Sequence, residues 1–197
     1  MRFVLYYQGR LPSSGNNNDK HKIRQALHPQ LKRLWEIEQP LIKLSQSTEQ
    51  IGEGPRITGL EKIANDFVRD GFRFVPLVTK NYSLVSHLDI IFLRREAPGE
   101  LVRHGGDIDN RINTLFDSLR VADASQVTGL SPIATENPFY CLLEDDSLIT
   151  GFQVRTERLL EPPTSPQNDT DVRLSIIAVV RPTMVTFKNI GFLGGWL

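Results

Sequence analysis

The sequence has a single cysteine, Cys141, among its 197 residues, so it cannot form an internal disulfide bond. This excludes the small secreted scaffolds that depend on disulfides and favours a reducing compartment. No run approaches the roughly 18 consecutive apolar residues that a membrane-spanning helix needs. The apolar stretch at the N-terminus is short, and no cleavage-site pattern of small residues follows it. We therefore expect a soluble, cytoplasmic protein.

An excess of charge of either sign is also lacking. Lysine plus arginine and aspartate plus glutamate both total 23, which gives a formal net charge of zero. Proteins that bind nucleic acid usually present a basic surface, so any basic patch here must be local. Hydrophobic residues make up 40% of the chain, which excludes wholesale disorder, and the length suits a single domain.

Apolar residues at helical spacing predict helices, and short runs of branched and aromatic residues predict strands. The clearest helix follows Asp107, because Ile112, Leu115, Phe116 and Leu119 recur at i, i+3, i+4 and i+7. Strands that neighbour one another in the sequence, with the helices kept apart from them, predict an α+β fold with a small mixed sheet and helices packed on it. The predicted strands are 3–7, 72–78, 83–93, 148–159 and 171–180. One predicted helix begins at Pro29, and two others span 59–70 and 107–119.

Two acidic groups flank that helix. Asp107 and Asp109 lie two residues apart at its start, and Asp145-Asp146 stands before the next predicted strand. Mg²⁺ prefers hard oxygen ligands and, once bound, can polarise a phosphodiester and lower the pKa of an attacking water. We predict that the four carboxylates converge on such an ion. The alternative is a structural protein in which these residues only cap a helix and form a turn.

The two motifs, with the Phe116-Asp117-Ser-Leu119 helix end between them, resemble the RusA family of Holliday-junction resolvases. The resemblance extends over about residues 83–180. It implies a homodimer that binds branched DNA, such as four-way junctions, and cuts it with Mg²⁺, Mn²⁺ being an alternative ion. Residue by residue, it implies that Asp107, Asp109 and Asp146 are the catalytic metal ligands and that Asp145 assists them.

The chain departs from the family in three places. Asn113 stands where the family usually has a lysine that helps to stabilise the cleaved phosphate. The region of about 1–71 is divergent, and the connection of about 121–143 is a long insertion within one RusA-like domain, 1–197. The missing lysine keeps a second interpretation open, in which a non-catalytic RusA-like protein binds branched DNA or a protein partner.

Arginines near the acidic motif are the predicted DNA contacts, since they can neutralise backbone phosphates. The alternative is that these arginines are ordinary solvent-exposed residues of a surface loop. The residues concerned are Arg94, Arg95, Arg103 and Arg111.

Overall fold

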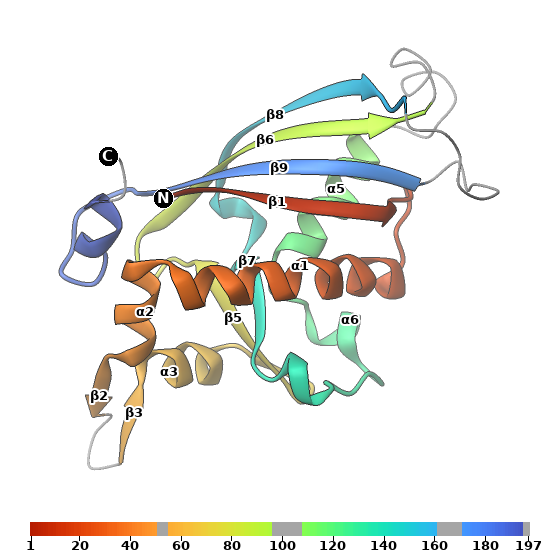
Figure 1. Ribbon diagram of the computed structural model, residues 1–197. Coiled ribbons are helices and arrows are strands. Elements are labelled where there is room, and N and C mark those ends of the chain that lie inside the picture. The colour runs from red at the N-terminus through yellow and green to blue at the C-terminus, as the bar shows by residue number, and fades with distance from the viewer. Residues whose placement is uncertain (51–54, 96–107, 161–170, 195–197) are drawn as a thin grey trace.

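In the computed structural model, a four-stranded sheet forms the upper layer of the protein, and helices lie beneath it (Figure 1). The structure describes residues 1–50, 55–95, 108–160 and 171–194. The elements are β1 (Arg2–Arg10), α1 (Asn17–Ile37), α2 (Gln39–Gln46), β2 (Thr48–Gln50), β3 (Arg56–Thr58), α3 (Gly59–Asp66), β4 (Val68–Arg69), β5 (Phe72–Val78), β6 (Leu84–Arg94), α5 (Ile108–Leu119), α6 (Ala124–Val127), η1 (Ala134–Glu136), β7 (Phe139–Leu143), η2 (Asp146–Leu148), β8 (Ile149–Arg158), β9 (Asp171–Pro182) and η3 (Ile190–Gly194).

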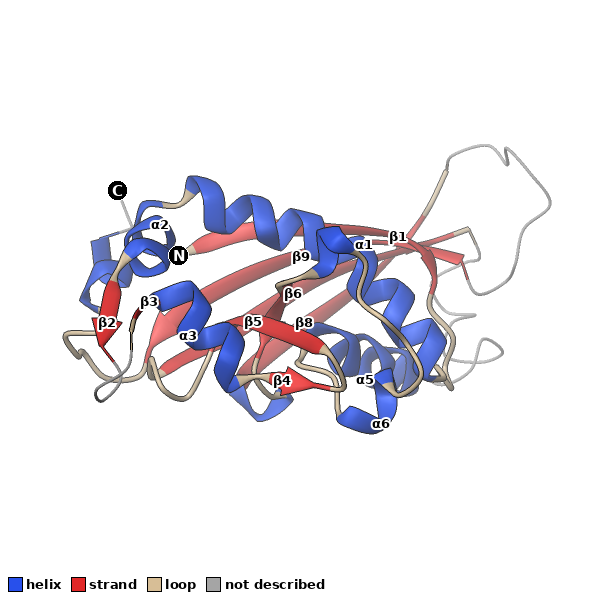
Figure 2. Ribbon diagram, turned by 90° about the horizontal axis from the view of Figure 1, so that it is seen from below, coloured by secondary structure: helices blue, strands red, loops and turns tan. Residues whose placement is uncertain are grey.

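The upper sheet has the strand order β1-β9-β6-β8. β9 is antiparallel to both of its neighbours, whereas β6 and β8 are parallel. Alternate side chains of a strand point to opposite faces, and the helices that the structure describes cover only the lower face of this sheet (Figure 2). The buried residues of β9 accordingly follow a period of two: Val172, Leu174, Ile176, Ala178 and Val180.

Helix α1 lies between this sheet and a second, three-stranded sheet of order β4-β5-β7 (Figure 1). Its buried aliphatic residues join the main core, and α1 packs against β1, β7 and α5. The α+β class is thus confirmed. Among the described helices, none combines the length and apolar character needed to cross a bilayer.

The prediction that the first helix begins at Pro29 was wrong, because α1 begins twelve residues earlier. Asn16 caps it: its side chain accepts a hydrogen bond from the Asp19 backbone at 2.9 Å, and the Asp19 carboxylate accepts one from the Asn16 backbone at 3.3 Å. This reciprocal cap satisfies two N–H groups that a helix start leaves without partners. Pro29 therefore lies inside the helix.

No predicted strand lies in the connection of about 121–143, yet this connection contains α6, η1 and the strand β7. All five residues of β7 are buried, so the strand lacks the alternation of a half-exposed strand. β7 pairs in parallel with β5, and Pro76 of β5 lies opposite Cys141. On the other side of β5, the described strand β4 pairs only with Phe72 and Arg73. Pro76 therefore interrupts no hydrogen bond between these two strands.

The exposed edge of β1 is blocked by a side chain of α1. The Gln30 amide accepts a hydrogen bond from the Tyr6 N–H at 2.9 Å and donates one to the Tyr6 carbonyl at 2.7 Å. An unpaired strand edge is a template for association with other strands. Gln30 therefore protects the middle of this edge.

Two histidines of α1 are buried against aromatic rings of the lower sheet. His21 lies edge-on to Phe72 at 5.6 Å between ring centroids, and His28 lies 4.6 Å from Phe139. The Nδ1 atom of His28 accepts a hydrogen bond from the Tyr140 N–H, which leaves the proton on Nε2 to be donated to the Thr135 carbonyl. Burial lowers the pKa of both imidazoles.

The buried histidines predict a loss of stability in mild acid. Because their folded-state pKa lies below the ordinary value near 6.5, the unfolded chain binds more protons as the pH falls below about 6.5. The contribution of the two histidines to the free energy of unfolding should therefore be constant well above that pH and should decline as the pH falls below it. We expect His28→Gln to flatten this decline in urea titrations. His87→Gln, which replaces an exposed histidine, should leave it unchanged, and an equal slope in His28→Gln would contradict the account.

Candidate functional site

The two acidic motifs lie on either side of helix α5. From β6 the chain continues through α5 and β7 and returns as β8, parallel to β6 in the same sheet. α5 packs beneath β8, where the rings of Phe116 and Phe152 meet edge to face at 5.1 Å. The first motif thus leads into α5, and the second lies in the turn before β8.

Asp109 lies in the first turn of α5 with an exposed side chain. A carboxylate there is favoured by the partial positive charge of a helix N-terminus. Asn113, one turn further along, is also exposed. Asp107 lies outside the described residues.

Asp145 and Asp146 follow β7 and begin the η2 turn. Asp145 accepts hydrogen bonds from both the hydroxyl and the N–H of Ser147, the latter at 3.0 Å. These bonds, helped by the positive charges of Lys80 and Arg120, lower the pKa of Asp145. Asp146 is exposed.

The described carboxylates do not meet at one point. The end of α5 is fastened to the end of β7 by a hydrogen bond from the Val121 N–H to the Leu143 carbonyl at 2.9 Å, so Asp145 lies near this end of the helix. Asp109 lies at the other end, about 16 Å away along the axis at 1.5 Å per residue. Within the described ranges, no group of three or more His, Cys, Asp or Glu side chains could hold a metal. Because Asp107 is not described, the four-carboxylate site stays a prediction.

The predicted DNA-contacting arginines are mostly not on the surface. Arg111 is 3% exposed and donates a hydrogen bond to the carbonyl of Leu11, so it fastens the chain after β1 to α5. Arg94 is likewise 3% exposed, and Arg95 is half-buried. Arg103 lies outside the described residues. A phosphate contact by Arg111 or Arg94 is therefore not supported in this structure.

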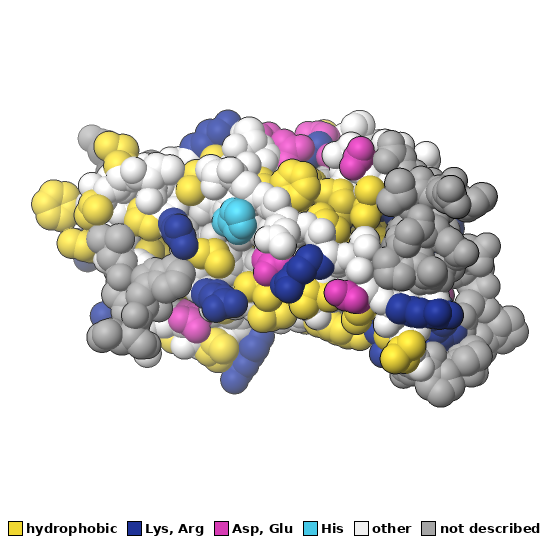
Figure 3. All heavy atoms as spheres, turned by 90° about the horizontal axis from the view of Figure 1, so that it is seen from above, with side chains coloured by type: hydrophobic (Ala, Val, Ile, Leu, Met, Phe, Trp, Pro, Cys, Tyr) yellow, Lys and Arg dark blue, Asp and Glu magenta, His cyan; other side chains and the backbone are white. Residues whose placement is uncertain are grey.

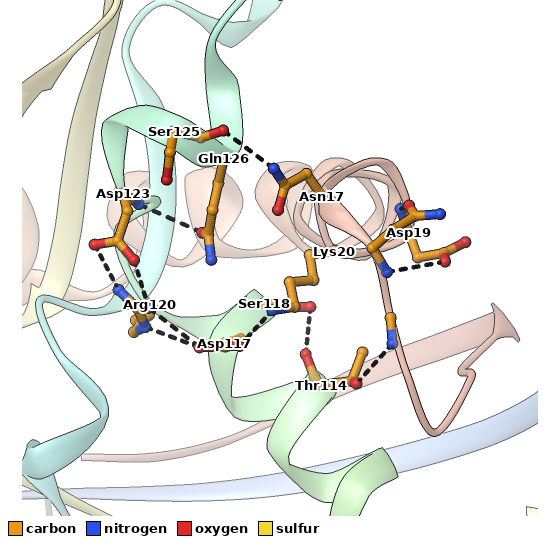
Figure 4. Close-up of polar contacts among 12 residues, drawn as sticks. Asn17, Asp19, Lys20, Thr114, Asp117, Ser118, Arg120, Asp123, Ser125 and Gln126 are labelled. Carbon is orange, nitrogen blue, oxygen red and sulfur yellow. Dashed lines mark hydrogen bonds and ion pairs between the residues drawn. The ribbon is translucent and has the colours of Figure 1, made fainter.

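A network of charged side chains ties α1, α5 and α6 together (Figure 4). Asp117 of α5 lies 2.5 Å from the Lys20 ammonium and 3.1 Å from the Arg120 guanidinium, which in turn reaches Asp123 at 2.8 Å. Partial burial would raise the pKa of Asp117, but hydrogen bonds and positive charge from Lys20 and Arg120 hold it below its ordinary value. All four charges therefore have partners, which is typical of a structural clamp.

Arg24 of α1 lies behind this network with a side chain that is 1% exposed. Its Nη2 atom donates to the Asp117 carbonyl and to the Gln126 amide oxygen, both at 2.6 Å. Nε and Nη1 have no hydrogen-bond partner among the described residues. Burial lowers the pKa of Arg24 to about 10 and raises the pKa of the neighbouring Cys141 thiol. A thiol kept protonated in this way is a poor nucleophile.

Sequence reasoning missed this clamp because it started the first helix too late. With the helix beginning at Asn17, Lys20, Arg24, Leu27 and Leu31 fall at i, i+4, i+7 and i+11 and lie on one face. Arg111 follows the same rule, since Leu115 and Ser118 stand four and seven residues after it and are buried. Helical spacing was thus the available signal in both cases.

Comparisons with models of protein families, with curated proteins and with solved structures found no match to this chain. The interpretation of the site therefore depends on its own residues.

We predict that the clamp stabilises the fold through Arg24. Gln126→Ala removes one acceptor from a buried guanidinium, and a lost hydrogen bond to a charged group costs about 2 kcal/mol of unfolding free energy. Urea denaturation measures this loss. Ser125→Ala, on the exposed side of α6, is the matched control and should stay within about 0.5 kcal/mol of the parent. Equal effects of the two substitutions would contradict the role assigned to Arg24.

Proposed function

We propose that the protein is a Mg²⁺-dependent endonuclease that acts as a homodimer on Holliday junctions or other branched DNA. The observation that carries this proposal is the order of the β6–α5–β8 connection. A strand is followed by Asp-x-Asp-Asn at the start of a helix, and Asp-Asp then stands in the turn before the parallel neighbour of that strand. This is the order of motifs that the resemblance to the RusA family rests on.

The donor set fits a hard cation. Asp107, Asp109 and Asp146 would hold the ion through carboxylate oxygens, which Mg²⁺ prefers. A bound Mg²⁺ activates water and neutralises charge on the phosphodiester. Asp145 holds the turn that carries Asp146 through its hydrogen bonds to Ser147.

The proposal requires that the two acidic segments approach each other when metal and DNA bind. Asp109 and Asp146 are both exposed, so neither side chain has to leave the core. Because α5 holds them about 16 Å apart, the first turns of α5 or the η2 turn would have to move for one ion to bind both. Mutual repulsion of carboxylates opposes this approach, and a shared divalent ion would offset it.

A non-catalytic protein that binds branched DNA or a protein partner is the second candidate. One observation favours it: Asn113 is exposed on α5 but neutral, so it cannot supply the positive charge of the lysine found at this position in the RusA family. The two candidates share DNA binding and differ only in cleavage.

Cleavage of a labelled synthetic four-way junction tests the proposal. We expect symmetric nicks with Mg²⁺ or Mn²⁺, none with EDTA, and none in a matched linear duplex. Asp109→Asn should reduce the cleavage rate more than about a hundredfold, because a metal ligand contributes several kcal/mol to catalysis. Asp66→Asn, an exposed carboxylate at the end of α3, should cleave like the parent. Binding without cleavage in either metal would favour the second candidate, and equal rates for Asp109→Asn and the parent would contradict the assigned site.

A further inference from the structure

The upper face of the four-stranded sheet, which the described helices leave uncovered, has a hollow of about 260 Å³ at the start of β8. Figure 3 looks onto this face and shows one exposed histidine, with hydrophobic, Lys or Arg, and Asp or Glu side chains nearby. A water molecule occupies about 30 Å³ in the liquid, so the hollow has room for a small polyatomic ion with water. It is lined by Val85, Ser86, His87, Thr150, Val179 and Arg181.

An irregularity in the strand pairing shapes the hollow. Ser86 pairs with Ile149, but the next residue, His87, pairs with Gly151, so Thr150 is left over as a bulge. The Thr150 hydroxyl donates a hydrogen bond to the Ser86 carbonyl at 3.1 Å, which holds the bulge in place. Bulges are enriched next to functional sites because they change the direction of side chains.

Gly151 allows His87 to lie close to the backbone of β8. A Cβ atom at position 151 would lie only 2.7 Å from the Nδ1 atom of His87 and 3.1 Å from its Cε1 atom. Only glycine therefore accommodates the imidazole in this position without a shift. The glycine thus leaves room for the ring at the rim of the hollow.

The lining has the chemistry of an anion site. His87 and Arg181 supply N–H donors, and none of the six lining residues is acidic. In the β6–β9 ladder, Val85 pairs with Arg181 and His87 pairs with Val179, so the two basic side chains are close neighbours on the same face. The carboxylate of Asp89, two residues further along β6, is neutralised by Arg155 at 3.1 Å.

We propose that this hollow binds a phosphate group. It lies at the start of β8, close to the η2 turn, since Asp146 stands four residues before Thr150. If the proposed nuclease function holds, the ligand is a backbone phosphate of DNA beside the cleaved bond. The phosphate site itself does not depend on that function, because a free phosphate or a phosphorylated small molecule offers the same chemistry.

Nuclear magnetic resonance of the histidine imidazoles tests the phosphate site directly, with His87→Gln identifying the resonance of His87. Titration with inorganic phosphate at constant ionic strength should give a saturable shift of this resonance, whereas chloride should give none. Arg181→Gln should weaken the apparent affinity about fivefold. Gly151→Ala should weaken it as well, because the added methyl group displaces the ring, and its melting curve reports whether the fold is retained.

Fluorescence anisotropy with a labelled junction and a labelled duplex tests whether the phosphate belongs to DNA. The measurements are made in EDTA, so that the DNA is bound but not cleaved. His87→Gln and Arg181→Gln should each weaken binding about fivefold, and Arg181→Gln should also lower the salt dependence of log K by about one. Lys32→Gln removes an exposed charge from α1, on the other side of the sheet, and should bind like the parent.

The outcomes separate this site from the proposed nuclease function. Weaker DNA binding in the two variants supports a backbone phosphate even if the parent cuts nothing. A saturable phosphate shift without any DNA binding supports a phosphate site for a small molecule and counts against the nuclease. Absence of a saturable shift, together with parental DNA affinity in both variants, overturns the proposal whether or not Asp109→Asn abolishes cleavage.

Discussion

The parallel pairing of β6 with β8 is the constraint on which the rest of the structure depends. Two parallel neighbours cannot be joined by a hairpin, so the chain must cross the sheet between them. Here the crossing contains α5, α6 and β7, and it builds part of the second sheet on the way. The same pairing puts one acidic motif at the start of α5 and the other before β8. The bulge within it forms the hollow beside His87.

The position of α1 between two sheets has a cost, because its buried face includes Arg24, His21 and His28 as well as aliphatic residues. A buried cation is strongly unfavourable unless it is paired and hydrogen-bonded. The carbonyl of Asp117 and the amide of Gln126 offset this cost for Arg24, whereas Nε and Nη1 have no partner among the described residues. The histidines avoid the cost by staying neutral. The interior is thus held by directional bonds as well as by apolar contact.

Much of the fold could be predicted from the sequence, because helix 107–119 and the later strands have clear periodicity. The start of α1 could not, since three asparagines after a glycine are also typical of a loop, and only the reciprocal Asn16–Asp19 bonds reveal the cap. β7 was missed because a short, fully buried strand has no polar alternation. For the candidate site, the sequence gives the order of the acidic motifs along the chain. Their separation depends on the length of α5 and on how its end joins β7, which no local pattern encodes.

We propose that Asp109 and Asp146 serve one metal ion, although they lie near opposite ends of α5. Calorimetric titration of Mg²⁺ and Mn²⁺ into the parent, Asp109→Asn, Asp146→Asn and the double variant tests this most directly. One shared ion predicts a single binding event that either substitution removes, with no further loss in the double variant. Metal binding that survives either single substitution unchanged, or two events that are lost one at a time, would contradict the claim.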